Sequence, residues 1–149
     1  MTAAQDRMVS FEPLNERWGE YLLPSGILVR GRAVLTAIVV NKDGKGELRH
    51  AIQLESLGPS LGEPGSNEFR DEDVVSTVRD FQVLTEAQSL YRLKDGALIL
   101  QYQPKAFRLT GKNNARGEPL VQVQSGLGIE IMGSPAAEIA GALAAPPSP

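Results

Sequence analysis

The chain contains one histidine, His50, and no cysteine. A nucleophile activated by histidine, or a histidine-based metal site, would therefore have to use His50, and thiolate chemistry is excluded. His50 lies in a row with Leu48, Ile52 and Leu54, where a structural histidine is the favoured interpretation. The motifs of serine hydrolases, zinc proteases and phosphate-binding loops do not occur. We therefore rank an enzyme that uses His50 with a carboxylate last, and we expect no metal and no cofactor.

Basic residues gather in the centre of the sequence and form the candidate anion-binding patch. They are Arg30, Arg32, Lys42, Lys45 and Arg49. Cations beside aromatic side chains on a sheet bind single-stranded nucleic acid by phosphate contact and base stacking, and Trp18 is a candidate for such stacking. Core packing is the favoured interpretation of Trp18 and Tyr21, and a solvated face with a bridge to Glu55 is the favoured interpretation of the arginines.

An acidic run, Asp71-Glu72-Asp73, is the only dense cluster of carboxylates in the sequence. Hard cations need several oxygens that converge from one loop, whereas consecutive residues of a strand point to opposite faces. We therefore expect a solvated acidic turn. The following residues, to position 81, fit either a short helix or a strand, and the β-branched run after Asp73 favours a strand.

Composition predicts one folded domain. The chain has 149 residues, 42% of them hydrophobic, and a formal net charge of −3. This length suits a single core, which we place in residues 1–133, with 1–7 as a candidate disordered start. A weak net charge gives no global attraction to nucleic acid or to acidic membranes. No apolar run is long enough to span a bilayer and the first residues lack a signal peptide, so we expect a cytoplasmic protein without membrane contact.

The strongest β signal extends from Ile27 to Val40 and is followed by a polar turn and a second alternating run from Leu48. These features predict an antiparallel hairpin. The apolar faces of the two strands lie on the same side of the sheet only when the numbers of paired residues add to an odd sum, as in Leu35 with Ile52. A slip of one residue would move every side chain of one strand to the other side. A bulge near the turn is allowed. Both faces of the first strand become apolar near Val40, which predicts cover on both sides there.

A second hairpin is predicted from Ser89 to Gln103 around Asp95-Gly96, a dipeptide typical of two-residue turns. With that turn, three pairs share one face: Leu93 with Leu98, Tyr91 with Leu100, and Ser89 with Tyr102. Pro104 is expected to break the second strand of this hairpin. Further short strands are expected at 105–110, 120–125 and 129–132.

The sequence thus predicts a mainly β fold, an antiparallel meander that closes into a small barrel or folds into a sandwich. Residues 134–149 predict a short C-terminal α-helix followed by a proline-rich tail, because Ser134 and Pro135 are typical of a helix start. The helix would carry a thin apolar stripe at Ile139 and Leu143.

The favoured function is a non-enzymatic assembly or adaptor module. Ile38, Val40, Ile139 and Leu143 are the candidate partner-binding residues, and symmetric self-association would bury them between copies. Another protein partner is the next expectation. Nucleic-acid or anion binding through the basic patch is the second hypothesis.

Overall fold

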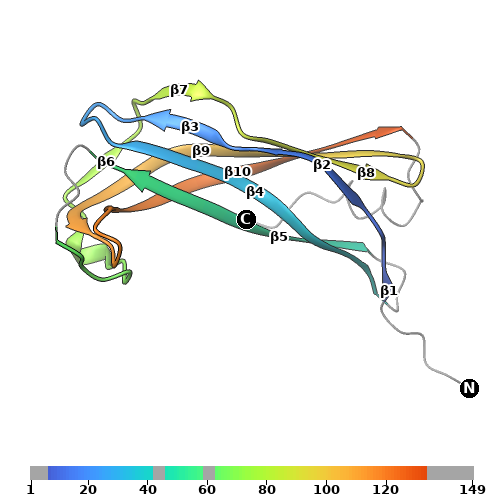
Figure 1. Ribbon diagram of the computed structural model, residues 1–149, viewed down its shortest axis with the longest axis horizontal. Coiled ribbons are helices and arrows are strands. Elements are labelled where there is room, and N and C mark those ends of the chain that lie inside the picture. Colours follow the sequence, from blue (N-terminus) through green and yellow to red (C-terminus); the bar gives the residue numbers. More distant parts are fainter. Residues whose placement is uncertain (1–6, 42–45, 59–62, 134–149) are drawn as a thin grey trace, which may run out of the picture.

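A computed structural model describes residues 7–41, 46–58 and 63–133. These residues form ten strands and one 3₁₀ turn, η1, in an elongated two-layered molecule (Figure 1). The strands are β1 Arg7–Met8, β2 Glu12–Arg17, β3 Gly19–Leu22, β4 Leu28–Val40, β5 Gly46–Leu57, β6 Ser76–Val78, β7 Gln82–Thr85, β8 Gln88–Leu93, β9 Gly96–Asn113 and β10 Pro119–Gly133; η1 is Asp71–Asp73. The predicted C-terminal helix and the start of the chain, residues 1–6, lie outside the described residues.

The strands form two five-stranded antiparallel sheets. In the first sheet β5 pairs with one edge of β4, while β1 and β3 pair with different parts of its other edge and β7 pairs with β3. In the second sheet β10 pairs with one edge of β9, while β8 and β6 pair with parts of the other edge and β2 pairs with β8. The strands form no closed barrel, so that alternative is wrong.

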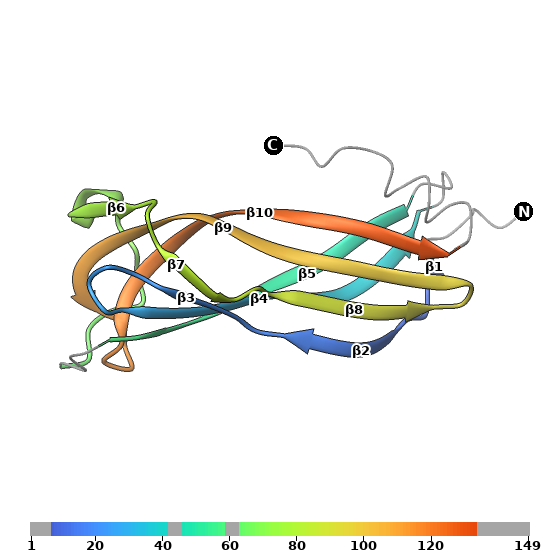
Figure 2. The same cartoon turned by 90° about the horizontal axis from the view of Figure 1, so that it is seen from above.

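The predicted meander is correct only for β3–β4–β5 and for β8–β9–β10. Elsewhere the chain changes sheet between consecutive strands. For example, β2 belongs to the second sheet and β3 to the first, and likewise β6 belongs to the second sheet and β7 to the first. Figure 2 shows β8, β9 and β10 extending along one layer, with β3, β4 and β5 in the other.

The apolar core lies between the two sheets. One cluster joins Ala33, Leu35 and Ile38 of β4 to residues of β8 and β9, among them Tyr91 and Leu98. A second cluster lies toward the other end and consists of Tyr21, Leu23, Val29 and Phe107. Burial of these side chains between the layers is the main driving force for the fold.

The central hairpin has the predicted odd sum over most of its length, from Leu28 opposite Leu57 to Leu35 opposite His50. Beyond Thr36 the sum becomes even, since Ala37 faces Arg49, so Thr36 is a bulge near the turn, as the sequence allows. The bulge keeps Leu35 and Ile38 in the same core. Residues 37–40 are all buried, which confirms the prediction that this end is covered on both faces.

The second hairpin forms, but its register differs from the prediction. Tyr91 faces Leu98 and Leu93 faces Gly96, so the loop is Lys94-Asp95. Gly96 has no left-handed conformation. It is a strand residue, and a Cβ there would overlap the carbonyl oxygen of Met132 on β10. Glycine is therefore required here by the close approach of β9 to β10, and not by the turn. The set of residues on the inner face is nonetheless the predicted one.

Pro104 does not end its strand. β9 continues through it, and Pro104 pairs with Ser125 at an irregularity where Lys105 is the additional residue. A proline is tolerated at such a position because the ladder is already interrupted. The short strands expected on either side therefore merge into β9 and β10. Residues 71–81 contain both η1 and strand β6, so the preference for strand was right only for the later part.

Candidate functional site

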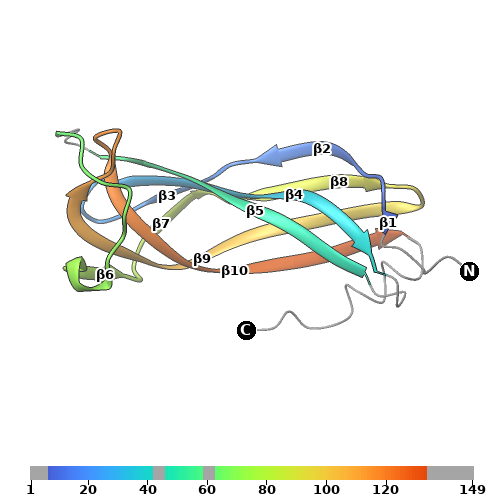
Figure 3. The same cartoon turned by 90° about the horizontal axis from the view of Figure 1, so that it is seen from below.

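The most prominent feature that the fold leaves open is one edge of strand β5. β5 has twelve residues and, within the described parts of the chain, pairs only with β4, beside which it extends along most of the molecule (Figure 3). Its other edge therefore presents backbone N–H and C=O groups from about half of its residues, as in any edge strand. Such an edge can accept a further strand.

Three large apolar side chains of β5 are also exposed. Ile52 is 40% exposed, Leu54 39% and Leu57 42%. Ile52 and Leu54 pair with Ala33 and Gly31, so they belong to the face that is turned toward the second sheet. β5 is an edge strand of its sheet, and the second sheet covers these two side chains only in part. Leu57 pairs with Leu28 and lies on the outer face. The edge thus combines free backbone groups with an apolar strip, Ile52 and Leu54, on its inner face.

The other free edges are less suited to accept a strand. β2 contains Pro13 and is otherwise mostly polar or charged, and β7 has only four residues. Proline, charge and short length are the usual protections of an edge. β10 is long but contains Gly126, Gly128 and Gly133, which weaken a strand. β5 has no glycine or proline after Gly46.

Arg30 and Arg32 lie on the outer face of the first sheet with Trp18 between them. Their guanidinium carbons lie 4.9 and 4.5 Å from the centre of the Trp18 ring, which is a cation–π distance. Tyr21 is in the core, as predicted, whereas Trp18 is only partly buried and covered by these arginines. The structure therefore brings two of the five predicted basic residues together with an aromatic side chain.

Arg30 and Arg32 already form ion pairs and hydrogen bonds with other groups of the protein. Arg30 forms an ion pair with Glu55 at 2.9 Å, the bridge that the sequence predicts, and lies 3.8 Å from Glu20. Arg32 donates to the side-chain oxygen of Gln53 at 2.7 Å and to the carbonyl oxygen of Glu16 at 2.8 Å. The contacts fasten β3, β4 and β5 together and reduce the positive field available to an outside anion.

Of the remaining predicted basic residues, the structure describes only Arg49, and it does not join this group. Lys42 and Lys45 lie outside the described residues. Arg49 is exposed on β5, four residues along the strand from Gln53, and lies 3.6 Å from Glu47. His50, the candidate catalytic residue, is exposed on β5 and pairs with Leu35. No group of three or more potential metal ligands occurs in the described parts of the chain.

Two of the predicted partner-binding residues are buried by the fold. Ile38 is 1% exposed and packs in the core between the sheets, and Val40 is 4% exposed. Neither side chain is available to a partner in this conformation. Ile139 and Leu143 lie outside the described residues. The exposed apolar side chains in the described part of the chain include instead Ile52, Leu54 and Leu57 of β5.

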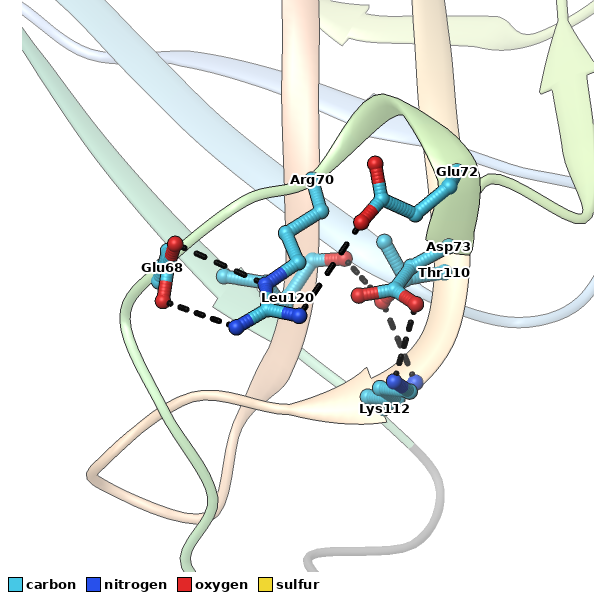
Figure 4. A network of polar contacts seen from close by, with 7 residues as sticks. All are labelled: Glu68, Arg70, Glu72, Asp73, Thr110, Lys112 and Leu120. Carbon is cyan, nitrogen blue, oxygen red and sulfur yellow. Dashed lines mark hydrogen bonds and ion pairs between the residues drawn. The ribbon is translucent and has the colours of Figure 1, made fainter.

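The acidic turn η1 is bound to the second sheet by ion pairs. Asp71 pairs with Arg108 at 2.9 Å and Asp73 with Lys112 at 3.0 Å. Arg70, which precedes the turn, lies 3.5 Å from Glu68 and 3.9 Å from Glu72 (Figure 4). A hollow of about 430 Å³ lies beside Arg70, Asp73 and Lys112. Because these charges compensate one another, the arrangement serves to fasten the loop.

A smaller hollow of about 180 Å³ lies among Tyr21, Phe81 and Tyr102. Typical small-molecule sites enclose roughly 300–1,000 Å³, so this hollow is small for a substrate. No helix in the described parts of the chain has the length and apolar character needed to cross a membrane.

Comparison with protein-family models found no matching family, and searches of curated proteins and of solved structures found no significant match.

Sequence reasoning placed Ile52 and Leu54 in the apolar row of a hairpin but not at an open edge. One available signal was the segment after β5, GPSLGEPGSN, whose glycines and prolines end the strand. A chain that leaves the sheet there adds no next strand beside β5. The structure agrees, because the next strand among the described residues, β6, belongs to the other sheet.

Proposed function

We propose that this chain is a non-enzymatic assembly or adaptor module that binds a protein strand along the free edge of β5. The observation that carries the proposal is the twelve-residue edge with Ile52, Leu54 and Leu57 about two-fifths exposed. Strand addition is a common mode of peptide and protein recognition, in which the backbone supplies affinity and alternate side chains supply specificity.

The proposal predicts that two lysines on the exposed strip abolish association. We expect the full chain, purified at low salt, to give a native mass above that of one chain, whether the added mass is another copy or another protein. The double variant Ile52→Lys, Leu54→Lys should give the mass of a single chain, because a charge there is costly to bury.

The matched control is Val83→Lys, Leu84→Lys on the edge strand β7, where the two side chains are 47% and 49% exposed. It should associate like the parent. A parent that has the mass of one chain at every concentration would refute the proposal. The proposal would equally fail if the β7 variant lost association while the β5 variant kept it.

Anion binding by Arg30 and Arg32 is the second candidate, and their position over Trp18 is the observation that favours it. The ion pairs with Glu55 and Glu20 weigh against it, since an incoming phosphate would have to compete with both carboxylates. We therefore rank it below strand addition.

A further inference from the structure

We propose that the strand bound at this edge is β5 of a second copy of the chain, antiparallel to the first about a two-fold axis at Ile52. The inference rests on the proposed function and adds the identity and register of the partner. In this arrangement the numbers of paired residues add to 104. Ile52 faces the partner's Ile52, and the other pairs are Ala51 with Gln53, His50 with Leu54, Arg49 with Glu55, Leu48 with Ser56, and Glu47 with Leu57.

Charge complementarity favours this register. Arg49 of each copy lies opposite the partner's Glu55, so the two-fold axis makes two opposite-charge pairs. The side chains are available: Arg49 is 56% exposed and Glu55 37%. Glu55 already accepts a hydrogen bond from Arg30 at 2.9 Å. A carboxylate can accept several hydrogen bonds, so Glu55 would lie between Arg30 of its own chain and the partner's Arg49.

Neighbouring registers lack this complementarity. An axis at Ala51 places Glu47 opposite the partner's Glu55, twice, and like charges directly opposite destabilise a sheet. An axis at Gln53 places Arg49 opposite the partner's Leu57. Odd-sum registers would turn the apolar side chains of one copy to the opposite face from those of the other. Among these alternatives, only the axis at Ile52 joins unlike charges and keeps the faces matched.

The same register closes the apolar strip. Ile52 meets its own copy at the axis, and Leu54 of each chain lies one pair further out on the same face. Side chains that are about 40% exposed in one chain therefore gain apolar neighbours. The two first sheets become one continuous sheet, which also pairs the free backbone groups of both β5 edges.

Charge exchange tests the contact between Arg49 and Glu55. Arg49→Glu should weaken dimerisation by about tenfold or more, because two attractive pairs become repulsive. The double variant Arg49→Glu, Glu55→Arg should restore much of the parent affinity. Arg92→Glu on β8, where Arg92 is 63% exposed, is the matched control and should dimerise like the parent. Sedimentation measures the affinities, and thermal unfolding verifies that each variant is folded.

A single cysteine tests the axis directly, since the parent contains none. Directly opposite residues have Cα atoms about 4.5–5.5 Å apart, within disulfide reach. Ile52→Cys should therefore form a linked dimer under mild oxidation. Leu54→Cys has nearly the same exposure, but its two copies would be about 13 Å apart, and it should not.

The outcomes separate this inference from the proposed function. A complex with a different protein that Ile52→Lys, Leu54→Lys disrupts would support strand addition and overturn self-pairing. A homodimer that forms a disulfide through Leu54→Cys, or whose affinity is unchanged by Arg49→Glu, would overturn the proposed register but not the self-association. A parent with the mass of a single chain at every concentration would overturn both.

Discussion

Tyr91 is the residue that holds the bulge of the central hairpin in place. Its hydroxyl accepts a hydrogen bond from the Leu35 N–H at 2.8 Å and donates one to a Glu16 carboxylate oxygen at 2.6 Å. Leu35 precedes the bulged Thr36, where the ladder is interrupted. One buried side chain thus connects β8, β4 and the end of β2.

Removing this hydroxyl should destabilise the protein. In Tyr91→Phe the buried Leu35 N–H loses its acceptor, and we expect the free energy of unfolding to fall by about 1–3 kcal/mol. Tyr102 provides the control, because within the described part of the chain its buried hydroxyl makes no hydrogen bond of regular geometry. Tyr102→Phe should cost less than Tyr91→Phe in urea denaturation. Equal losses would contradict this role of Tyr91.

The buried tyrosines also predict a loss of stability at high pH. Burial, and after it the hydrogen bond to the Glu16 carboxylate, raise the pKa of Tyr91 to about 12. Burial likewise raises the pKa of Tyr102 to about 12, while a weak polar contact with the Ser125 side chain acts in the opposite direction. In the unfolded chain both pKa values are about 10.

Whether the free energy of unfolding rises or falls with pH depends on which state, folded or unfolded, binds more protons. Below pH 10 both states keep the phenol protons and stability is complete. Between pH 10 and 12 the unfolded chain releases protons that the folded chain retains, so the free energy of unfolding falls by about 1.4 kcal/mol per pH unit for each tyrosine. Tyr91→Phe should show a shallower fall when urea denaturation is repeated across this range. A profile that stays flat up to pH 12 would contradict the prediction.

The sequence predicted that Tyr91 faces the core, but not what its hydroxyl does. Alternation of apolar side chains is sufficient to assign a residue to a face. The partners of the hydroxyl come from β2 and β4, far away in sequence, and depend on the position of the bulge. No local pattern contains that information. The bridge from Arg30 to Glu55 could be predicted because both residues belong to one hairpin.

At the scale of elements, the close approach of β4 to β9 depends on Gly31. A Cβ at this position would lie 2.7 Å from Cε2 of Tyr102 and 2.9 Å from Cδ2 of Leu54. Both side chains thus occupy the space above the glycine. Gly31 therefore joins the core packing to the β5 strip on which the proposed function depends.

Gly31→Ala should lower the free energy of unfolding by about 1–3 kcal/mol, because overpacking forces Tyr102 and Leu54 to move. Gly126→Ala on β10 is the control: a Cβ there would meet Cε of Lys105 at 3.7 Å, an ordinary contact. Urea denaturation of both variants measures the difference. A Gly31→Ala variant as stable as Gly126→Ala would show that β4 and β9 can move apart freely.

The two hairpins show what element prediction can achieve. In both, alternation identified the inner face correctly. In the second, the Asp95-Gly96 dipeptide suggested the wrong register because Gly96 is required by the backbone of β10, a strand more than twenty residues later. Local turn chemistry was outweighed by a long-range contact.

At the scale of the whole molecule, sheet order determines which strands remain open. Composition and alternation predicted the antiparallel β class, but the distribution of strands between two sheets depends on crossings that carry little sequence signal. The same limit applies to the candidate site. The alternation of apolar residues in β5 predicts that Ile52 and Leu54 are buried in the core. They are exposed because no described strand pairs with the other edge of β5.

Amide hydrogen exchange along β5, measured at protein concentrations above and below association, shows whether this strand is the binding edge. We expect the outward N–H groups of β5 to exchange more slowly when the protein is associated, while the exchange at the edges of β2, β7 and β10 is unchanged. In Ile52→Lys, Leu54→Lys the concentration dependence should disappear. Exchange in β5 that is equally fast at every concentration, or slowing at β10 instead, would contradict the assignment of β5 as the binding edge.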